Sequence, residues 1–390
     1  MKNTMKRLWF AAVLTLCARA TASAYDLTVA ESEHGTVGFS VGGTAVTTAE
    51  AGQVVTISIK PAADYAVDVV KAQAYTSWGT AQSRRAPGLV KDITLTGSGT
   101  EWTFMMPEAN VEVSALYKQT TLHYDMDAED TESGKDVDGV TLTMTITDEE
   151  AKNVTIEHIV VPTSLSDEAL TVHIPALVAG YEVTGIAASA VPADCNVTDI
   201  YLPETEQPIN IEQDALPATT NIHTPLALLD DYALMLSLKD NFETLKVMTT
   251  VTPKNTHWTL SCGVDVVLPD ELKLYMVYTD GQAIRMTVID SDQLVLAQGR
   301  HGIKANNGVL IIGQSGRSYD LVACPGRQQS GTVPATTDAK SYGEKNQLEP
   351  VIVRKNYAAG QYYVLKDNQF HSIKGNTSRV KACRAVLRVK

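Results

Sequence analysis

Two of the eight histidines occupy matching places in a repeated sequence pattern. Residues 172–175 read Val-His-Ile-Pro, residues 222–225 read Ile-His-Thr-Pro, and a third copy at 200–203 reads Ile-Tyr-Leu-Pro. Imidazoles aligned in this way are potential metal ligands, but zinc also needs a third ligand and outer groups that orient the first ones. We therefore interpret His173 and His223 as polar positions of a repeat, with zinc ligation as the alternative.

Sequence motifs for catalysis are missing. No serine lies in a G-x-S-x-G turn, no H-E-x-x-H pair occurs, and the glycine-rich stretches lack the spacing of a phosphate-binding loop. Asp125, Asp127 and Glu129 alternate as calcium ligands do, but Asp130 stands where a calcium loop requires glycine. The sequence predicts no catalytic residue, no cofactor and no metal site. Calcium binding and an enzyme of unrecognised type are the alternatives.

Aromatic side chains could instead serve recognition. Trp102 lies in a strand-like stretch, where tryptophan usually belongs to the core, whereas Trp78 lies in what reads as an insertion over 76–98. Trp78 is therefore the better candidate for an exposed contact, and the outer positions of the repeats supply others. The candidate ligand contacts are His173, Tyr181, Tyr201, His223 and Trp78.

The first 24 residues have the order of a secretory signal peptide. Basic residues precede the apolar run Leu8–Leu16, and the small residues Ala22-Ser23-Ala24 follow it. We expect cleavage before Tyr25, export, and a secreted or cell-surface location with no membrane-spanning segment after cleavage. A membrane anchor is the alternative, but the run is far shorter than the roughly 20 residues of a spanning helix. Lipidation of Cys17 is disfavoured because leucine precedes it.

Charge and cysteine content limit the partners and the redox chemistry. The net charge is −13, of which the leader contributes +4, and this leaves −17 for the remainder. So acidic a chain repels nucleic acid, which we exclude as a partner. Four cysteines beyond the leader allow two disulfides with three connectivities, and buried free thiols are the alternative. These cysteines are Cys195, Cys262, Cys324 and Cys383.

Residues 25–118 alternate apolar and polar residues between turn sequences, which predicts a β-rich domain. Residues 34–37 (His-Gly-Thr-Val), 51–57 (Ala-Gly-Gln-Val-Val-Thr-Ile) and 104–113 (Phe-Met-Met-Pro-Glu-Ala-Asn-Val-Glu-Val) resemble the divergent internalin B-repeat module of bacterial surface proteins. Asp64 departs from this resemblance, because the module usually has glycine there. The resemblance implies a spacer or stalk.

Residues 119–139 and 140–250 differ sharply in pattern. The first stretch is acidic without apolar periodicity, which predicts a linker or an exposed hairpin. In the second, Val183-Thr184-Gly185-Ile186 with Ala190 is echoed about 25 residues later around Ile211. A unit of this size must stack on a neighbour to bury its apolar face, so we expect a short solenoid.

The repeats are similar to the leucine-rich repeats of BspA-like bacterial surface antigens. The "I-x-I-P" element appears at residues 172–175 and, in altered form, at 200–203. Ala190-Val191 and Ala215-Leu216 replace the usual Ala-Phe, so the repeats are degenerate. A short capping helix should follow them, with Leu228, Tyr232, Met235 and Leu238 on one face.

Residues 251–390 return to strand patterning and predict a β-sandwich-like domain. Two stretches, 303–311 and 380–388, resemble each other, and each is expected to form a turn that leads into an apolar strand. With Tyr363-Val364-Leu365 and Phe370, the segment resembles a C-terminal β domain of exported proteins from Bacteroidetes-type bacteria. No activity follows from that resemblance.

The sequence thus predicts a mainly β, multi-domain chain, consisting of a β-rich N-terminal module, a short leucine-rich-repeat solenoid and a C-terminal β-sandwich-like domain. The function we expect is non-catalytic adhesion or recognition of a host or extracellular-matrix protein or glycan. Two alternatives remain: a structural spacer of the cell envelope, and a carbohydrate-binding module. The low aromatic content of 6% makes the carbohydrate module the weaker of the two.

Overall fold

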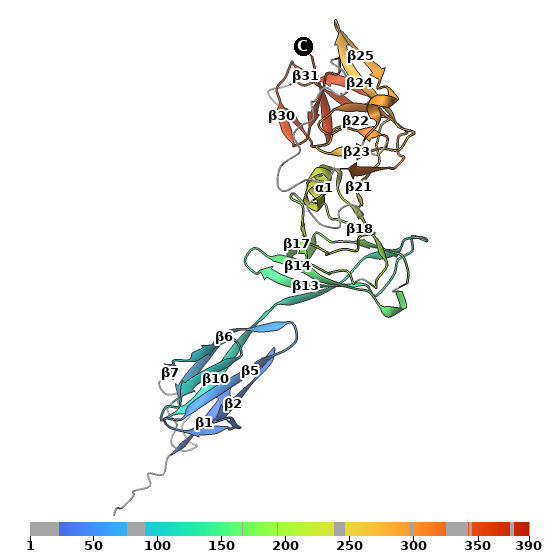
Figure 1. Cartoon of the computed structure of the whole chain (residues 1–390). Helices are drawn as coiled ribbons and strands as arrows, with labels where there is room; N and C mark the ends of the chain where they lie inside the picture. The colour runs from blue at the N-terminus through green and yellow to red at the C-terminus, as the bar shows by residue number, and fades with distance from the viewer. Residues whose placement is uncertain are drawn as a thin grey trace, which may run out of the picture. The chain divides into compact units, whose positions relative to one another are not determined.

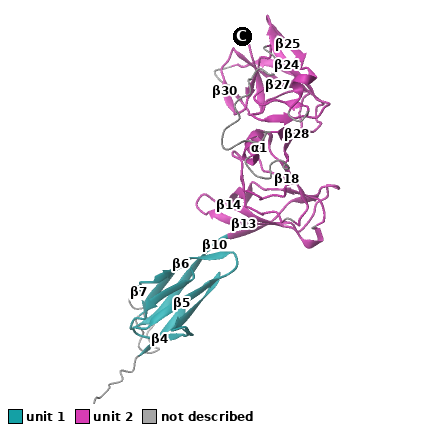
Figure 2. Ribbon diagram, in the orientation of Figure 1, with its two compact units in different colours: residues 1–120 teal, residues 121–390 magenta. Residues whose placement is uncertain are grey.

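Strands dominate the chain, which confirms the mainly β prediction (Figure 1). The computed structural model describes residues 23–75, 90–165, 167–192, 194–237, 246–296, 300–324, 342, 345–374 and 378–389. The chain divides into two compact units, residues 1–120 and 121–390 (Figure 2). The expected signal peptide, apart from its last two residues, and Trp78 lie outside the described residues.

The first unit consists of two five-stranded sheets around one core. One sheet has the order β4-β1-β10-β6-β7 and the other β3-β2-β5-β9-β8. Alternate residues enter the core: Val55 and Ile57 from β5, Val111 and Val113 from β10, each 0% exposed. The strands are β1 (Ala24–Val29), β2 (Gly35–Val41), β3 (Thr44–Ala45), β4 (Thr48–Glu50), β5 (Val54–Pro61), β6 (Tyr65–Tyr75), β7 (Val90–Ile93), β8 (Thr96–Ser98), β9 (Glu101–Met105) and β10 (Asn110–Gln119).

The first unit tolerates Asp64 at a position where the resemblance predicts glycine. The residue has φ = 67°, in the left-handed region that glycine enters freely. Aspartate and asparagine enter this region more readily than most other residues. The turn between β5 and β6 therefore keeps its conformation.

Of the two expectations for residues 119–139, the linker is wrong, and the exposed hairpin is met in part, because Glu129 forms an antiparallel bridge with Asp136 within this stretch. Within it, β11 (Thr121–Asp125) pairs with β13 (Thr141–Asp148), and β12 (Ala128–Asp130) pairs with β15 (Leu170–His173). The apolar residues that make this possible are sparse but correctly spaced, because Leu122, Met126 and Ala128 are all buried. The carboxylates between these apolar residues obscured the strand spacing in the sequence. The second unit therefore begins at residue 121.

Two ladders of parallel strands build the next part of the second unit. In one, β15, β18 (Val197–Tyr201), β20 (Asn221–His223) and β21 (Lys246–Val251) lie side by side. In the other, β14 (Asn153–Val160), β17 (Tyr181–Ile186) and β19 (Asn210–Ile211) do so. The short strand β16 (Leu177–Val178) pairs with β17, and a 3-10 turn, η1, spans Thr163–Leu165.

A short helix follows β20, as expected. The 3-10 turn η2 (Leu226–Leu228) leads into α1 (Leu229–Ser237), which packs against β21 and β28. Tyr232 is fully buried, and its hydroxyl accepts a hydrogen bond from the Ile209 amide at 2.9 Å. The expected face residue Leu238 lies outside the described residues. Within the described part of the chain, no helix is long and apolar enough to cross a membrane.

The expected domain boundary at 250/251 is not a boundary between compact units. It falls at the end of β21, which pairs with β20 on one side and with β28 (Tyr319–Cys324) on the other. One sheet thus continues in the order β12-β15-β18-β20-β21-β28-β23-β26. Backbone hydrogen bonds therefore join the repeat region to the C-terminal region in one unit.

Two four-stranded sheets, β22-β27-β24-β25 and β29-β34-β31-β32, share an apolar core in the C-terminal region. Both stretches that resemble each other form the expected turn before an apolar strand, β27 in one sheet and β34 in the other. The elements are β22 (His257–Leu260), β23 (Asp265–Val267), β24 (Lys273–Asp280), β25 (Ala283–Val288), η3 (Ser291–Leu294), β26 (Gly302–Ile303), β27 (Val309–Ile312), β29 (Leu348–Val351), β30 (Lys355–Tyr357), β31 (Tyr362–Lys366), β32 (Gln369–Ser372), β33 (Ser378–Val380) and β34 (Arg384–Arg388).

Candidate functional site

Three of the candidate contacts form one row of stacked rings. The parallel register pairs His173 with Tyr201 and Tyr201 with His223. The His173 and Tyr201 ring centroids are 4.7 Å apart with an interplanar angle of 18°, and those of Tyr201 and His223 are 4.1 Å apart at 10°. Because neighbouring strands of a sheet lie about 4.8 Å apart, side chains in register are at stacking distance. We call these three residues the ring stack.

The ring stack is open to solvent at one end and closed at the other. The His173 side chain is 40% exposed, and Tyr201 is 36% exposed. The His223 side chain is only 10% exposed. His173 and Tyr201 are therefore accessible from solvent, whereas His223 is buried and stacks on the Tyr201 ring.

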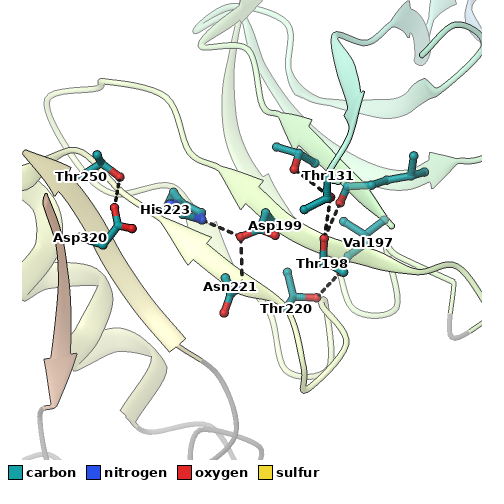
Figure 3. A network of polar contacts seen from close by, with 11 residues as sticks. Thr131, Val197, Thr198, Asp199, Thr220, Asn221, His223, Thr250 and Asp320 are labelled. Carbon is teal, nitrogen blue, oxygen red and sulfur yellow. Dashed lines mark hydrogen bonds and ion pairs between the residues drawn. The ribbon is translucent and has the colours of Figure 1, made fainter. Parts of the chain in front are cut away.

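Asp199 anchors the closed end. Its Oδ1 lies 2.8 Å from His223 Nε2 and accepts a hydrogen bond from Asn221 Nδ2 at 3.0 Å (Figure 3). Burial raises the pKa of the Asp199 carboxyl, but hydrogen bonds from His223, Asn221 and Thr198 outweigh burial, so the pKa is lowered. Asp199 is thus held as a carboxylate beside the imidazole.

Further carboxylates surround the tyrosine. Glu129 Oε1 lies 3.9 Å from His173 Nε2, and Asp320 accepts a hydrogen bond from Thr250 at 2.7 Å (Figure 3). The pKa of Tyr201 is raised, first by partial burial and then by the negative charges of Asp199, Asp320 and Glu129. The exposed edge of the ring stack therefore combines aromatic surface with a negative potential.

His223 retains an unused polar atom. Its Nδ1 is buried and has no hydrogen-bond partner among the described residues. A buried polar atom without a hydrogen-bond partner lowers the stability of the folded state, so the burial of this imidazole has a cost in folding free energy. The compensating contacts are the Asp199 carboxylate and the stacked Tyr201 ring.

The geometry does not support a shared metal ion at the histidines. The Tyr201 ring lies between the two imidazoles and stacks on both. Across the described ranges, no group of three or more histidine, cysteine, aspartate or glutamate side chains is placed to hold a metal. Asp125, Asp127 and Glu129 are among the residues so described. Stacking accounts for the aligned histidines without a metal.

Tyr181 belongs to a different place. It begins β17 in the other ladder, where its hydroxyl donates to Glu149 Oε2 at 2.7 Å and Lys152 Nζ lies 4.7 Å from its ring centroid. Its ring thus has partners of its own and does not join the ring stack. Trp78 lies outside the described residues, and Trp258 is buried at 4% exposure.

The polar residues around the ring stack were missed from the sequence, although a signal for two of them existed. Asp199 stands two residues before Tyr201, and Asn221 stands two residues before His223. Side chains two positions apart in a strand lie on one face, so the repeat alignment places both beside the rings. Asp320 comes from β28, nearly 100 residues further on, and no sequence spacing points to it.

Comparisons with protein-family models, with curated proteins and with solved structures give no match. The resemblances stated above therefore depend on the quoted motifs alone.

Proposed function

We propose that this chain is an exported, non-catalytic recognition protein that binds a host or extracellular-matrix protein through the ring stack. The observation that carries the proposal is the pair of solvent-accessible rings, His173 and Tyr201, within a carboxylate-lined edge. Tyrosine is favoured at interfaces because it offers a rigid apolar ring with a polar tip. The leader-like first 24 residues support export.

The charge around the rings favours a basic protein segment as the ligand. Lysine and arginine pair with carboxylates and pack their methylene chains along apolar surface. Tyr201 offers its ring edge to such a side chain, because an imidazole covers each of its faces. Glu129, on β12, lies beside the exposed end of the ring stack. Asp320, on β28, lies beyond the buried end, and its negative charge contributes to the raised pKa of Tyr201. A spacer would need no such arrangement.

The test is a binding screen of the purified chain against extracellular-matrix proteins, plasma proteins and a glycan array. Tyr201→Ala is compared with wild type and with Tyr181→Ala, a matched control because Tyr181 is a partly exposed tyrosine of the other ladder. Point variants are used rather than an isolated repeat segment. Without the C-terminal region, β21 would lose its pairing with β28 and become an unpaired edge strand.

We expect saturable binding to a protein, reduced at least roughly tenfold by Tyr201→Ala, the size of a hot-spot contact, and unchanged by Tyr181→Ala. Binding that Tyr201→Ala leaves intact would contradict the site. Silence on every panel would favour the spacer, and preference for glycans over proteins would favour a carbohydrate-binding module.

A further inference from the structure

Two buried cysteines meet in the C-terminal region. Cys262 follows β22, Cys383 precedes β34, and each is 1% exposed. Both residues belong to one buried core cluster, and their side chains lie close enough to interact. The Cys383 thiol donates to the Leu226 carbonyl at 3.0 Å. Both are thiols in this structure. Residues far apart in sequence thus bring two sulfur atoms together.

Two hydrogen bonds next to the pair join the residues before Cys262 to the residues after Cys383. Ser261 Oγ donates to the Arg384 carbonyl at 2.5 Å, and the Ala385 amide donates to Thr259 Oγ1 at 3.1 Å. Ser261 and Thr259 are buried, at 0% and 4% exposure. The approach of the thiols is therefore fixed by the packing of β22 against β34.

Cys383 has a backbone conformation that is unusual for cysteine. Its φ is +57°, and the matching position of the related turn is Asn306, with φ = +60°. Asparagine tolerates this left-handed conformation, but cysteine has no such preference. The Asn306 amide donates to the Cys262 carbonyl at 2.8 Å, so both turns converge on Cys262. A cysteine at position 383 is explained by its partner thiol.

The other two described cysteines lack this arrangement. Cys324 accepts a weak contact from Arg300 Nη1 at 3.6 Å, and Cys195 lies beside Asp194. In the described part of the chain, neither has another cysteine as a hydrogen-bond partner. Of the three connectivities that the sequence allows, one joins residues 262 and 383. The structure supports that bridge and gives no contact for its second bridge, between residues 195 and 324.

We propose that Cys262 and Cys383 form a disulfide bond as the chain folds. The oxidant is a disulfide, either that of a thiol oxidoreductase or glutathione disulfide. One cysteine thiolate attacks a sulfur of the oxidant and gives a mixed disulfide, and the second thiolate displaces it. The products are the protein disulfide and two thiols, which take up the two protons. The inference rests on the proposed export only for the compartment that supplies the oxidant.

The folded dithiol should react slowly. The contact with Cys383, together with burial, raises the pKa of Cys262 well above the ordinary range of a thiol. Only thiolates attack disulfides, so few native molecules are reactive at neutral pH. We therefore expect the bond to form before β34 covers the pair.

The test is oxidative refolding of the purified chain. Reduced, unfolded protein is refolded with reduced and oxidised glutathione, free thiols are blocked with N-ethylmaleimide, and a tryptic digest is analysed by mass spectrometry. We expect residues 255–273 linked to residues 382–384, with the link lost on reduction. Blocked thiols on both peptides, or a predominance of links to Cys195 or Cys324, would overturn the proposal.

Variants separate the pair from the other cysteines. Cys195→Ser with Cys324→Ser should keep the link, whereas Cys262→Ala should abolish it. A phosphine reductant should lower the melting temperature of wild type and leave that of Cys262→Ala unchanged; equal shifts would contradict a native disulfide. The peptide map of wild type decides the matter even if Cys262→Ala fails to fold. Because no ligand is used, this test and the binding screen can fail separately.

Discussion

The two parallel ladders of the second unit share their inner rows and differ in their outer rows. Both inner rows are aliphatic and fully buried: Val172, Ile200 and Ile222 in one, Ile156, Ile186 and Ile211, at most 2% exposed, in the other. The outer row of the first is the ring stack, whereas that of the second has Gly185 between Thr155 and Asn210. Parallel stacking therefore supplies the frame, and side-chain type in one register decides whether a site exists.

The glycine of the second ladder shows why no stack forms there. A Cβ at Gly185 would lie 3.3 Å from Thr155 Oγ1 and 3.4 Å from the Asn210 carbonyl oxygen. A larger side chain would have to push these neighbours aside, so this row is packed more closely than the row of rings. The same parallel arrangement thus carries the stacked rings on one ladder and close packing on the other.

The largest expected effect concerns the shared inner rows. Ile200→Ala and Ile186→Ala should each lower the free energy of unfolding by about 2–5 kcal/mol, because each leaves a cavity in a fully buried row. Urea unfolding followed by circular dichroism measures both. A cost below about 1 kcal/mol for only one of them would show that the ladders are not equivalent inside.

The next effect concerns Asp230 of α1, the helix after β20. Burial raises its pKa to about 6, although the Gly263 and Val264 amides donate to it. The native state then holds its proton to higher pH than the unfolded state, so stability falls as pH rises from about 4 to 6. At about 1.4 kcal/mol per pKa unit, the loss is on the order of 2–3 kcal/mol.

Asp230→Asn should remove this slope. Unfolding free energies of wild type and variant are compared at intervals between pH 4 and pH 7. Parallel curves for the two proteins would contradict the raised pKa. The comparison also marks the contrast with Asp199, whose pKa is shifted in the opposite direction.

A smaller effect is expected at the outer row of the ring-stack ladder. Asp199→Asn removes the charge beside His223 and should cost about 1–2 kcal/mol, as for a hydrogen bond to a charged group. Asn210→Ala, in the outer row of the other ladder, is exposed and should stay within about 0.5 kcal/mol. Chemical denaturation tests both. Equal costs would remove the distinction between the outer rows.

The smallest expected effect is the acid dependence of the Asp199 contribution. Its pKa is lowered in the folded state, so its stabilisation is present above the ordinary aspartate pKa near 4 and is lost as pH falls through the folded value. The difference between wild type and Asp199→Asn should be present at pH 5 and shrink below pH 4. A difference that grows on acidification would contradict the lowered pKa.

The repeat register could be predicted from the sequence because it depends on local apolar spacing. Alignment of residues 172–175, 200–203 and 222–225 gave the equivalence of His173, Tyr201 and His223 that the strand pairing has. The stacking of the rings follows from that register. What the alignment could not give is the contribution of β28, since its pairing with β21 is non-local.

Boundaries were harder to predict than strands. Carboxylates between Leu122 and Ala128 masked two short strands, because each of these strands buries only one or two apolar residues. The junction at 250/251 looked like a domain boundary because the repeats end there. When the edge strands of two regions pair, the pairing does not change the apolar periodicity of either sequence, so the sequence does not reveal it.

The continuous sheet from β12 to β26 gives the second unit a mechanical property. If a ligand bound at Tyr201, its pull would pass from strand to strand through backbone hydrogen bonds into the C-terminal region. Rupture then requires many bonds to break together instead of the swing of one flexible joint. A protein bound at the ring stack would thus be attached to the whole hydrogen-bonded sheet rather than to one strand.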